Sequence, residues 1–265
     1  MPVKRKPVSK KKSTPQLKRQ NQRLMAENKL LAEQNRRTAE IASAVTHQLR
    51  TPLSGIKWVM KMLLDGDAGK LTPEQASLLQ QAYERNERII RLANDVLNII
   101  RIDTGNEPYR FAPQRMEEIV ENVLFDFIGT LRKKKILLVI HTPARKLPPI
   151  HVAPEQMRTA IQNLVDNAVK YTPPKGRIEI TLRRNGSAIE MSVRDTGIGI
   201  PKHQQHKLFT RFFRCDNAVQ TEAEGSGLGL FIVKNIIEKH GGSIHFTSRQ
   251  NEGTTFTLTV PLHRS

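Results

Sequence analysis

The chain has 265 residues, of which 38% are hydrophobic, so it can bury a core in one large domain or two ordinary ones. Its longest uninterrupted apolar run, Ile136–Ile140, is far shorter than the roughly 18 residues that a membrane-spanning helix needs. The charged start has no apolar stretch behind it and Cys215 is the single cysteine, which predicts a cytoplasmic protein without a signal peptide, membrane helix or intrachain disulfide.

Positive charge is concentrated at the start of the chain. The formal net charge is +18, and residues 1–40 contain 12 Lys or Arg against three acidic residues, a net charge of +9. Three prolines among these lysines predict a basic, disordered tail over residues 1–16. Clustered cations gain free energy at anionic surfaces, so this arm could contact a membrane or nucleic acid, receive a signal from an upstream sensor, or simply be solvated.

A heptad repeat follows the tail and predicts a coiled coil over residues 17–40. Its register continues without a break into residues 56–63, so we expect one helix of about 47 residues. Asn at a seam position favours a parallel coiled coil of two helices. The two seam positions hold Leu17, Leu24, Leu31, Thr38 and Val45, and Asn21, Asn28, Asn35, Ala42 and Leu49.

A second helix is predicted to fold back on the first. Gly66 and Gly69 end the first helix, in which Pro52 predicts a bend near His47 to Leu49. Thr72 is the predicted N-cap of the second helix. Its apolar positions keep the coiled-coil spacing and are Leu78, Ala82, Ile89, Leu92, Val96 and Ile99. Two such hairpins from two subunits would form a dimeric four-helix bundle over residues 41–105.

The pattern changes to mixed helices and strands near residue 106. Alternating residues flank Asn185-Gly186, a strong signal for a hairpin with a tight primed turn, and a final strand is predicted over Thr254–Val260. We therefore expect an α+β chain with two domains. The helical bundle is followed over residues 106–265 by an α/β sandwich, in which helices cover one face of a mixed sheet.

Five motifs follow one another along the chain, namely VTHQLRTPLSGIKW from Val45, NLVDNAVKYT from Asn163, DTGIGIP from Asp195, FTRFFR from Phe209 and GSGLGL from Gly225. They resemble the H, N, G1, F and G2 boxes of sensor histidine kinases. The resemblance runs from about Ile41 to Leu262 and implies a Bergerat-type ATP-binding domain behind the phosphoacceptor hairpin. It also implies a two-component activity, in which ATP phosphorylates a histidine and the group passes to an aspartate of a response regulator receiver domain.

His47 is the predicted phosphoacceptor. With Val45 and Leu49 at seam positions, His47 lies farthest from the bundle axis, and a neutral imidazole (reference pKa about 6.5) keeps a lone pair that can attack a γ-phosphate. Thr51, one turn later, could position a water for phosphatase activity, or could bond back to its own helix. Gln48 departs from the Glu or Asp that relatives usually carry. Because an amide cannot act as a base, an alternative is a weak kinase, or one that acts mainly as a phosphatase.

The N-box helix presents oxygen ligands and one cation on the same side. Asn163 and Asn167 are one turn apart, and Lys170 follows on that side. Amide oxygens suit Mg²⁺, and the lysine offsets phosphate charge. The resemblance implies that Asn167 holds Mg²⁺ and that Asn163, Lys170 and Tyr171 lie near the phosphates of ATP.

Three further segments complete the predicted ATP site. The resemblance implies that Asp195 accepts a hydrogen bond from adenine. The glycines beside it let the backbone approach the base. The segment between Pro201 and Glu224 resembles a mobile lid held by few apolar contacts, and Arg211 and Arg214 match its arginines. The predicted nucleotide-binding positions in these glycine-rich loops are Gly197, Gly199, Gly225, Gly227, Leu228 and Gly229.

Two other hypotheses are weaker. A zipper-type DNA-binding protein would need a continuous basic helix, which the prolines of the tail contradict, and it would leave the predicted ATP site without a role, so a nucleic-acid partner is disfavoured. The remaining histidines have no metal-ligand spacing and are predicted to be surface residues. They include His141, His151, His203, His206 and His240.

Overall fold

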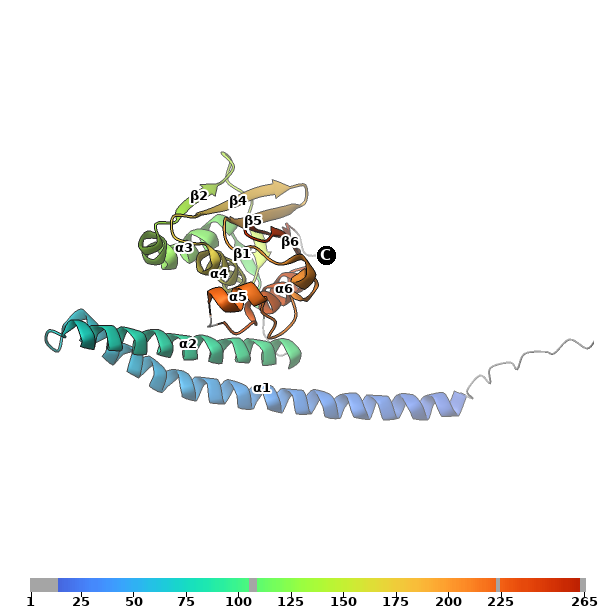
Figure 1. Cartoon of the computed structure of the whole chain (residues 1–265). Coiled ribbons are helices and arrows are strands. Elements are labelled where there is room, and N and C mark those ends of the chain that lie inside the picture. Colours follow the sequence, from blue (N-terminus) through green and yellow to red (C-terminus); the bar gives the residue numbers. More distant parts are fainter. Residues whose placement is uncertain (1–13, 105–108, 223–224, 263–265) are drawn as a thin grey trace, which may run out of the picture. The chain divides into compact units, whose positions relative to one another are not determined.

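The computed structural model describes residues 14–104, 109–222 and 225–262, which belong to two compact units (Figure 1). One unit comprises Met1–Ala93 and Ile100–Glu107, and the other comprises Asn94–Ile99 and Pro108–Ser265. Within the described ranges, no helix is both long enough and apolar enough to cross a membrane.

The first unit is built on a long helix. α1 (Thr14–Asp65) has 52 residues and passes through Pro52 without interruption, and Figure 1 draws it as one curved ribbon. The prediction of a single long helix is confirmed, although α1 begins ahead of Leu17. A local bend near His47 to Leu49 stays a prediction.

Glycines and a capping box shape the turn into α2 (Pro73–Thr104). Gly66 and Gly69 have φ values of 87° and 109°, which residues with a Cβ rarely adopt. The Thr72 N–H donates to Gln75 Oε1 (2.9 Å), and the Gln75 N–H donates to Thr72 Oγ1 (3.3 Å). The predicted N-cap is therefore confirmed, because these bonds pair a backbone donor that the first helical turn leaves without a partner.

The hairpin has one face where its helices meet and a second, exposed apolar face. Asn86 of α2 donates from Nδ2 to the Leu53 carbonyl of α1 (2.9 Å), and Lys57 Nζ lies 2.9 Å from Glu87 Oε1. Ile99, predicted at the seam, is buried (8% exposed), whereas six other predicted seam residues lie on the second face and are 47% to 68% exposed. They are Val45, Leu49, Ile56 and Val59 of α1, and Leu78 and Ile89 of α2. Removing this face from water would require a partner outside the hairpin.

The second unit contains the predicted mixed sheet, which has five strands. The strand order is β2 (Leu137–His141), β4 (Arg177–Asn185), β5 (Ala188–Asp195), β7 (Gly253–Pro261) and β6 (Ser243–Arg249). β2 and β4 are parallel, and the other neighbours are antiparallel. A separate antiparallel pair is formed by β1 (Ala112–Gln114) and β3 (Ile150–Val152).

The predicted hairpin around Asn185-Gly186 exists, but its turn lies one residue later. Asn185 pairs with Ala188, so the two-residue loop is Gly186-Ser187. Gly186 has a φ of 60°, which the first position of a primed turn requires. Asn185 extends β4 instead, and its Nδ2 donates to Glu190 Oε2 of β5 (3.1 Å).

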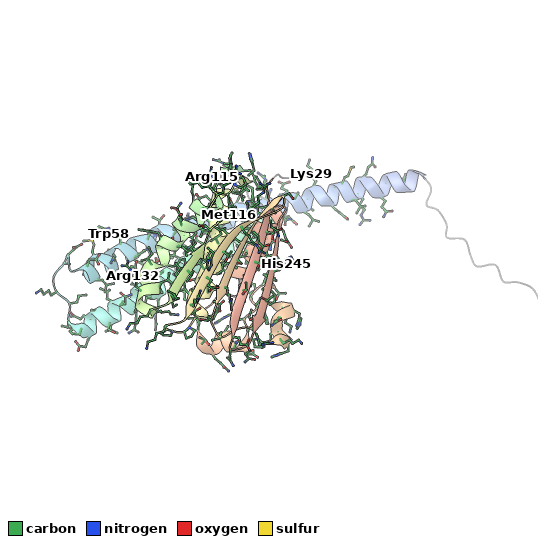
Figure 2. All side chains as sticks on the ribbon, turned by 90° about the horizontal axis from the view of Figure 1, so that it is seen from above. Lys29, Trp58, Arg115, Met116, Arg132 and His245 are labelled. Atoms are coloured by element: carbon green, nitrogen blue, oxygen red, sulfur yellow. The ribbon has the colours of Figure 1, made fainter. Side chains whose placement is uncertain are left out.

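Three helices cover one face of the sheet, which confirms the predicted sandwich (Figure 1). They are α3 (Met116–Lys134), α4 (Pro154–Tyr171) and α6 (Gly229–Lys239). Alternate residues of β4 and β5 are buried against them, namely Ile178, Ile180 and Leu182, and Ile189, Met191 and Val193. Figure 2 looks onto the opposite face, where His245 of β6 is exposed.

His240 is a core residue, so the prediction that it lies at the surface is wrong. Only 2% of it is exposed, and its ring lies against the rings of Tyr109 and Phe111. The Ala153 N–H donates to His240 Nε2 (2.9 Å), and Nδ1 lies 2.7 Å from the Ile236 carbonyl. Since Nε2 must accept, Nδ1 carries the proton and donates, and the neutral ring satisfies two backbone groups.

Candidate functional site

Asp195 ends β5 as a buried carboxylate. Its Oδ1 accepts hydrogen bonds from the Gly197 N–H (2.8 Å) and the Thr254 N–H (3.3 Å). Burial raises the pKa of Asp195 to about 6, and the two backbone donors oppose that rise. A carboxylate that loses water and keeps acceptor capacity is suited to a ligand that brings its own hydrogen-bond donor.

The loop after Asp195 is held closely against its neighbours. The Ile198 N–H donates to the Tyr171 carbonyl at the end of α4 (3.3 Å), and the Asn251 N–H donates to the Ile198 carbonyl (2.8 Å). A Cβ at Gly197 would lie 2.5 Å from the Tyr171 carbonyl oxygen, so no other residue fits without a shift. Gly199 has a φ of 61° and faces the Arg249 backbone. The predicted glycines therefore permit close approach of backbone segments.

α4 carries the predicted N-box residues on its partly exposed side. Asn163 Nδ2 donates to the Thr159 carbonyl one turn earlier (2.9 Å), and Lys170 Nζ forms an ion pair with Asp166 Oδ2 (2.5 Å). Asn167 is partly exposed between them. The opposite side of the helix is buried, with Met157, Ala160, Ile161, Leu164, Val165 and Ala168 in the core. The helix is thus anchored by packing while its amides and lysine face outward.

The glycine-rich loop at the start of α6 meets two other parts of the site. A Cβ at Gly225 would lie 3.0 Å from Arg214 Nε, and a Cβ at Gly227 would lie 2.6 Å from the backbone of Phe212. A Cβ at Gly229 would lie 2.6 Å from Asn163 Oδ1. These approaches bring the predicted lid, the N-box helix and the G2 loop together.

Leu228 anchors this loop. Its side chain is only 1% exposed and belongs to the hydrophobic core, whereas its N–H bonds with Ser226 Oγ (3.3 Å). Any role of Leu228 toward a nucleotide therefore falls to its backbone, since the side chain points into the protein.

The predicted lid contains two short helices and has more core contact than its polar sequence suggested. η1 (Lys202–Lys207) and α5 (Asp216–Thr221) flank a segment in which Leu208 and Cys215 are buried. Asn217 of α5 donates from Nδ2 to the Gly199 carbonyl (2.8 Å), which ties this segment to the loop after Asp195.

The two predicted lid arginines have different surroundings. The Arg211 guanidinium lies over the Phe231 ring of α6, 4.6 Å from its centroid. Arg214 donates to the carbonyls of Ala218 (3.3 Å) and Glu222 and thereby closes the end of α5. Burial raises the pKa of the Tyr171 hydroxyl, and the charge of Arg214 opposes that rise. Arg214 therefore lies beside the N-box helix, whereas the Arg211 side chain packs against α6.

The other predicted residues belong to α1. His47 lies in α1 one helical turn before Thr51, and its side chain falls outside the described residues. Gln48 and Thr51 are exposed. Gln48 therefore lies beside His47 on an accessible part of the helix.

Sequence reasoning missed two side chains that support this site. Lys134 ends α3 and donates to carbonyls at the end of α4. Ser248 Oγ accepts from the Ile200 N–H (2.8 Å) and donates to the Gly253 carbonyl (3.0 Å), joining the β6–β7 turn to the loop after Asp195. Lys134 stands in a run of lysines that resembles a solvated surface, and no local pattern distinguishes Ser248.

The donor set suits Mg²⁺ and a nucleotide. Among the described residues, no group of three or more His, Cys, Asp or Glu side chains could hold a metal ion. An ion at Asn167 would therefore take most of its ligands from phosphate oxygens and water, which is how Mg²⁺ is commonly bound. The loop backbones and the cations of α4 suit phosphates, and the buried carboxylate of Asp195 suits a base with an amino group.

Two family descriptions match the chain. Residues 37–105 match the "His Kinase A (phospho-acceptor) domain". Residues 152–264 match the "Histidine kinase-, DNA gyrase B-, and HSP90-like ATPase". These ranges contain His47 and the Asp195 site, respectively.

Curated relatives are similar over most of the chain. It is 31% identical over 228 residues to the circadian input-output histidine kinase CikA of Synechococcus elongatus, covering 86% of this chain and 30% of that protein. It is also 31% identical over 232 residues to the sensor histidine kinase WalK of Bacillus subtilis, covering 86% of this chain and 37% of WalK. The chain thus spans about a third of the length of these relatives.

Two solved structures are also similar to this chain. Full-length ShkA in complex with AMPPNP has a TM-score of 0.67 and 26% identity, covering 86% of this chain and 47% of that one. The catalytic domain of histidine kinase ThkA has a TM-score of 0.51 and 30% identity, covering 58% of this chain and 96% of that one.

Proposed function

This chain belongs to the sensor histidine kinases, and from that premise we propose that it is an ATP-dependent protein-histidine kinase that phosphorylates His47. The observation that carries the proposal is the meeting of Asp195, α4 and the G2 loop in the second unit, in a chain whose α1 holds an H-box. His47 then passes the phosphoryl group to an aspartate of a response regulator receiver domain.

The reaction proposed is a single phosphoryl transfer. A ring nitrogen of His47 attacks the γ-phosphorus of ATP, an N–P bond forms, the bond to the β,γ-bridging oxygen breaks, and ADP leaves, while the other ring nitrogen gives up its proton to water. Asp195 holds the adenine and Asn163, Lys170 and Tyr171 lie near the phosphates, while Arg211 and Arg214 stabilise charge during transfer. Asn167 is the protein ligand proposed for Mg²⁺, which would neutralise phosphate charge.

The chemistry of the product tests this proposal. The full chain is incubated with γ-labelled ATP and Mg²⁺, and the labelled protein is treated with acid or alkali. A phosphohistidine is expected to lose its label in acid and keep it in alkali. No label, or label that survives acid, would contradict histidine phosphorylation.

We further propose that residues 1–16 form a tail, 17–40 a signalling coiled coil, 41–105 the phosphoacceptor domain and 106–265 the ATP-binding domain. The basic tail, most of which lies outside the described residues, would contact an anionic membrane surface or an upstream sensor. Its excess of Lys and Arg supports either partner.

Nucleotide affinity should fall in acid because of Asp195. Burial raises its pKa to about 6, and only the ionised carboxylate is a full acceptor for the adenine amino group. Affinity should therefore be constant above about pH 7 and fall by up to about tenfold per pH unit below pH 6. Titration calorimetry with ADP from pH 5 to 8 measures this. The Asp195→Asn variant should bind ADP more weakly at pH 8. Any pH dependence that its affinity keeps is assigned to the phosphates of ADP. Equal pH profiles for the two proteins would contradict the role of Asp195.

We propose a parallel homodimer because the exposed seam residues of α1 and α2 need a partner. Deleting residues 1–40 should leave the chain dimeric, since most of this face lies beyond the coiled coil. Within the shortened chain, Ile56→Asp should give a monomer, whereas Ser54→Asp, an exposed control on the same helix, should not. Light scattering after gel filtration at micromolar concentration measures this. A monomeric shortened chain would mean that the coiled coil holds the pair together.

Gln48 favours a second candidate, a kinase whose forward reaction is slow or whose phosphatase activity dominates. Thr51, exposed one turn after His47, would then position water beside the phosphoaspartate of a bound response regulator.

A carboxylate beside His47 could accept the proton that an amide cannot, so Gln48→Glu should speed phosphorylation of His47 by roughly tenfold or more with little change in ATP affinity. Single-turnover labelling at saturating Mg²⁺-ATP measures the rate, with Gln34→Glu, an exposed change on the same helix, as control. An unchanged rate would mean that proton removal does not limit the reaction.

A further inference from the structure

Lys134, the last residue of α3, differs from the lysines beside it. Its Nζ donates to the carbonyls of Val169 (2.7 Å), Lys170 (3.1 Å) and Thr172 (3.4 Å) at the end of α4. An ammonium group has three donors, and these three carbonyls account for all of them. We propose that Lys134 is a positioning residue of the nucleotide site, which holds the last turn of α4 in the conformation that binds ATP; this rests on the function proposed above.

The sequence after α4 explains why this turn needs an external donor. In a continuing helix, the carbonyls of Val169 and Lys170 would accept from residues 173 and 174. Both of these residues are proline and have no N–H to donate. The Thr172 N–H still bonds to the Ala168 carbonyl (3.1 Å), so the backbone pairing stops immediately before the carbonyls that Lys134 reaches. A cation at this end also interacts favourably with the helix dipole.

Lys134 is partly buried in a way that its neighbours are not. Lys133 and Lys135 are exposed. Burial lowers the pKa of Lys134, and the charge of Glu222 opposes that shift. The Lys134 carbonyl also accepts from the Lys175 N–H (2.9 Å), so backbone and side chain both join α3 to the segment between α4 and β4. A partly desolvated cation is stable here because its donors face carbonyl oxygens.

The held turn leads directly to the predicted base-binding loop. Tyr171 lies between Lys170 and Thr172, and its carbonyl accepts the Ile198 N–H (3.3 Å). The adjacent Gly197 donates to Asp195 Oδ1 (2.8 Å) and has no room for a side chain beside the Tyr171 carbonyl. A small displacement of this turn would therefore move the loop that orients the Asp195 carboxylate.

The test compares Lys134→Met, which keeps most of the side-chain volume and loses the charge, with Lys133→Met as the matched control on the exposed side. Calorimetry with an ATP analogue and Mg²⁺ on the full chain should give a dissociation constant about tenfold higher for Lys134→Met, which loses the charge-assisted hydrogen bonds that hold the end of α4, and no change for Lys133→Met. In autophosphorylation, KM for ATP should rise by a similar factor while kcat stays within about twofold, since His47 is untouched. Lys134→Arg, which keeps a cation and donors, should recover part of the affinity.

A purely structural role predicts a different pattern, in which the thermal midpoint and the active fraction fall while KM and the dissociation constant of the folded protein stay at their original values. That pattern, or unchanged binding by Lys134→Met, would overturn the proposal. If Lys134→Met does not fold, Lys134→Gln replaces it, because its amide keeps two donors and should give an intermediate affinity; affinity equal to the starting protein would then overturn the proposal. Failure of the function itself is distinguishable, because the unsubstituted chain would then bind no nucleotide.

Discussion

His47→Ala should incorporate no label from γ-labelled ATP while it still binds ATP. The substitution removes the only histidine of the H-box, so the loss should be complete rather than partial. The predicted acceptor and the nucleotide site belong to different units of the chain, so the dissociation constant for ATP should stay within about twofold. Labelling and calorimetry on the same preparation measure both quantities.

His141→Ala is the matched control for this experiment, because His141 is an exposed histidine of the second unit with no predicted role. It should be labelled at the normal rate. Acid-labile label that persists on His47→Ala would assign the acceptor to another residue. A joint loss of labelling and ATP binding would instead indicate that the substitution disturbs the fold.

Asn167→Ala should lose Mg²⁺-dependent nucleotide binding. Asn167 is the proposed metal ligand on α4, and removing even an indirect partner of a bound metal typically costs about 10–100-fold in affinity, so a direct ligand should cost at least that much. Calorimetry with ATP, with and without Mg²⁺, measures the effect. The variant should bind with similarly low affinity in both conditions, and His47 should not be labelled although it is present.

Asn122→Ala offers a control of the same chemical change, since Asn122 is exposed on α3. It should keep the Mg²⁺ dependence of binding. If Asn167→Ala also keeps that dependence, Asn167 is not a metal ligand, and the oxygen ligands come from elsewhere in the site. A fall in affinity that is equal with and without Mg²⁺ would place Asn167 at the nucleotide rather than at the metal.

Features that depend on residues close together in the sequence were predictable from it. The spacing of apolar residues predicted the long α1, and the Thr72 capping box marked the start of α2. Alternation along β4 and β5 predicted their hairpin. Each signal lies within a few residues, where periodicity and capping act directly on the backbone. The one-residue shift of the turn arose because Asn185 pairs with Ala188 instead of entering the loop.

The sequence named the residues of the proposed nucleotide site but did not show their contacts with one another. The boxes indicated Asp195, α4 and the G2 loop. That the Gly229 backbone meets Asn163, and that Gly227 meets Phe212, follows from the path of the chain between them. The pKa of Asp195 similarly depends on burial by segments distant in sequence.

By itself the sequence determined the two long helices, the β4–β5 hairpin, the family resemblance and the identity of the chemical groups, because these follow from local periodicity, capping and motif order. Only the tertiary structure decided which isolated polar residues became internal supports. His240 looked like a surface histidine, yet it satisfies the Ala153 N–H in the core. Lys134 looked like one cation in a solvated run, yet it replaces the donors that the prolines after α4 lack. The physical reason is that a buried backbone group must be paired, and its partner can come from any part of the chain that folding brings near it.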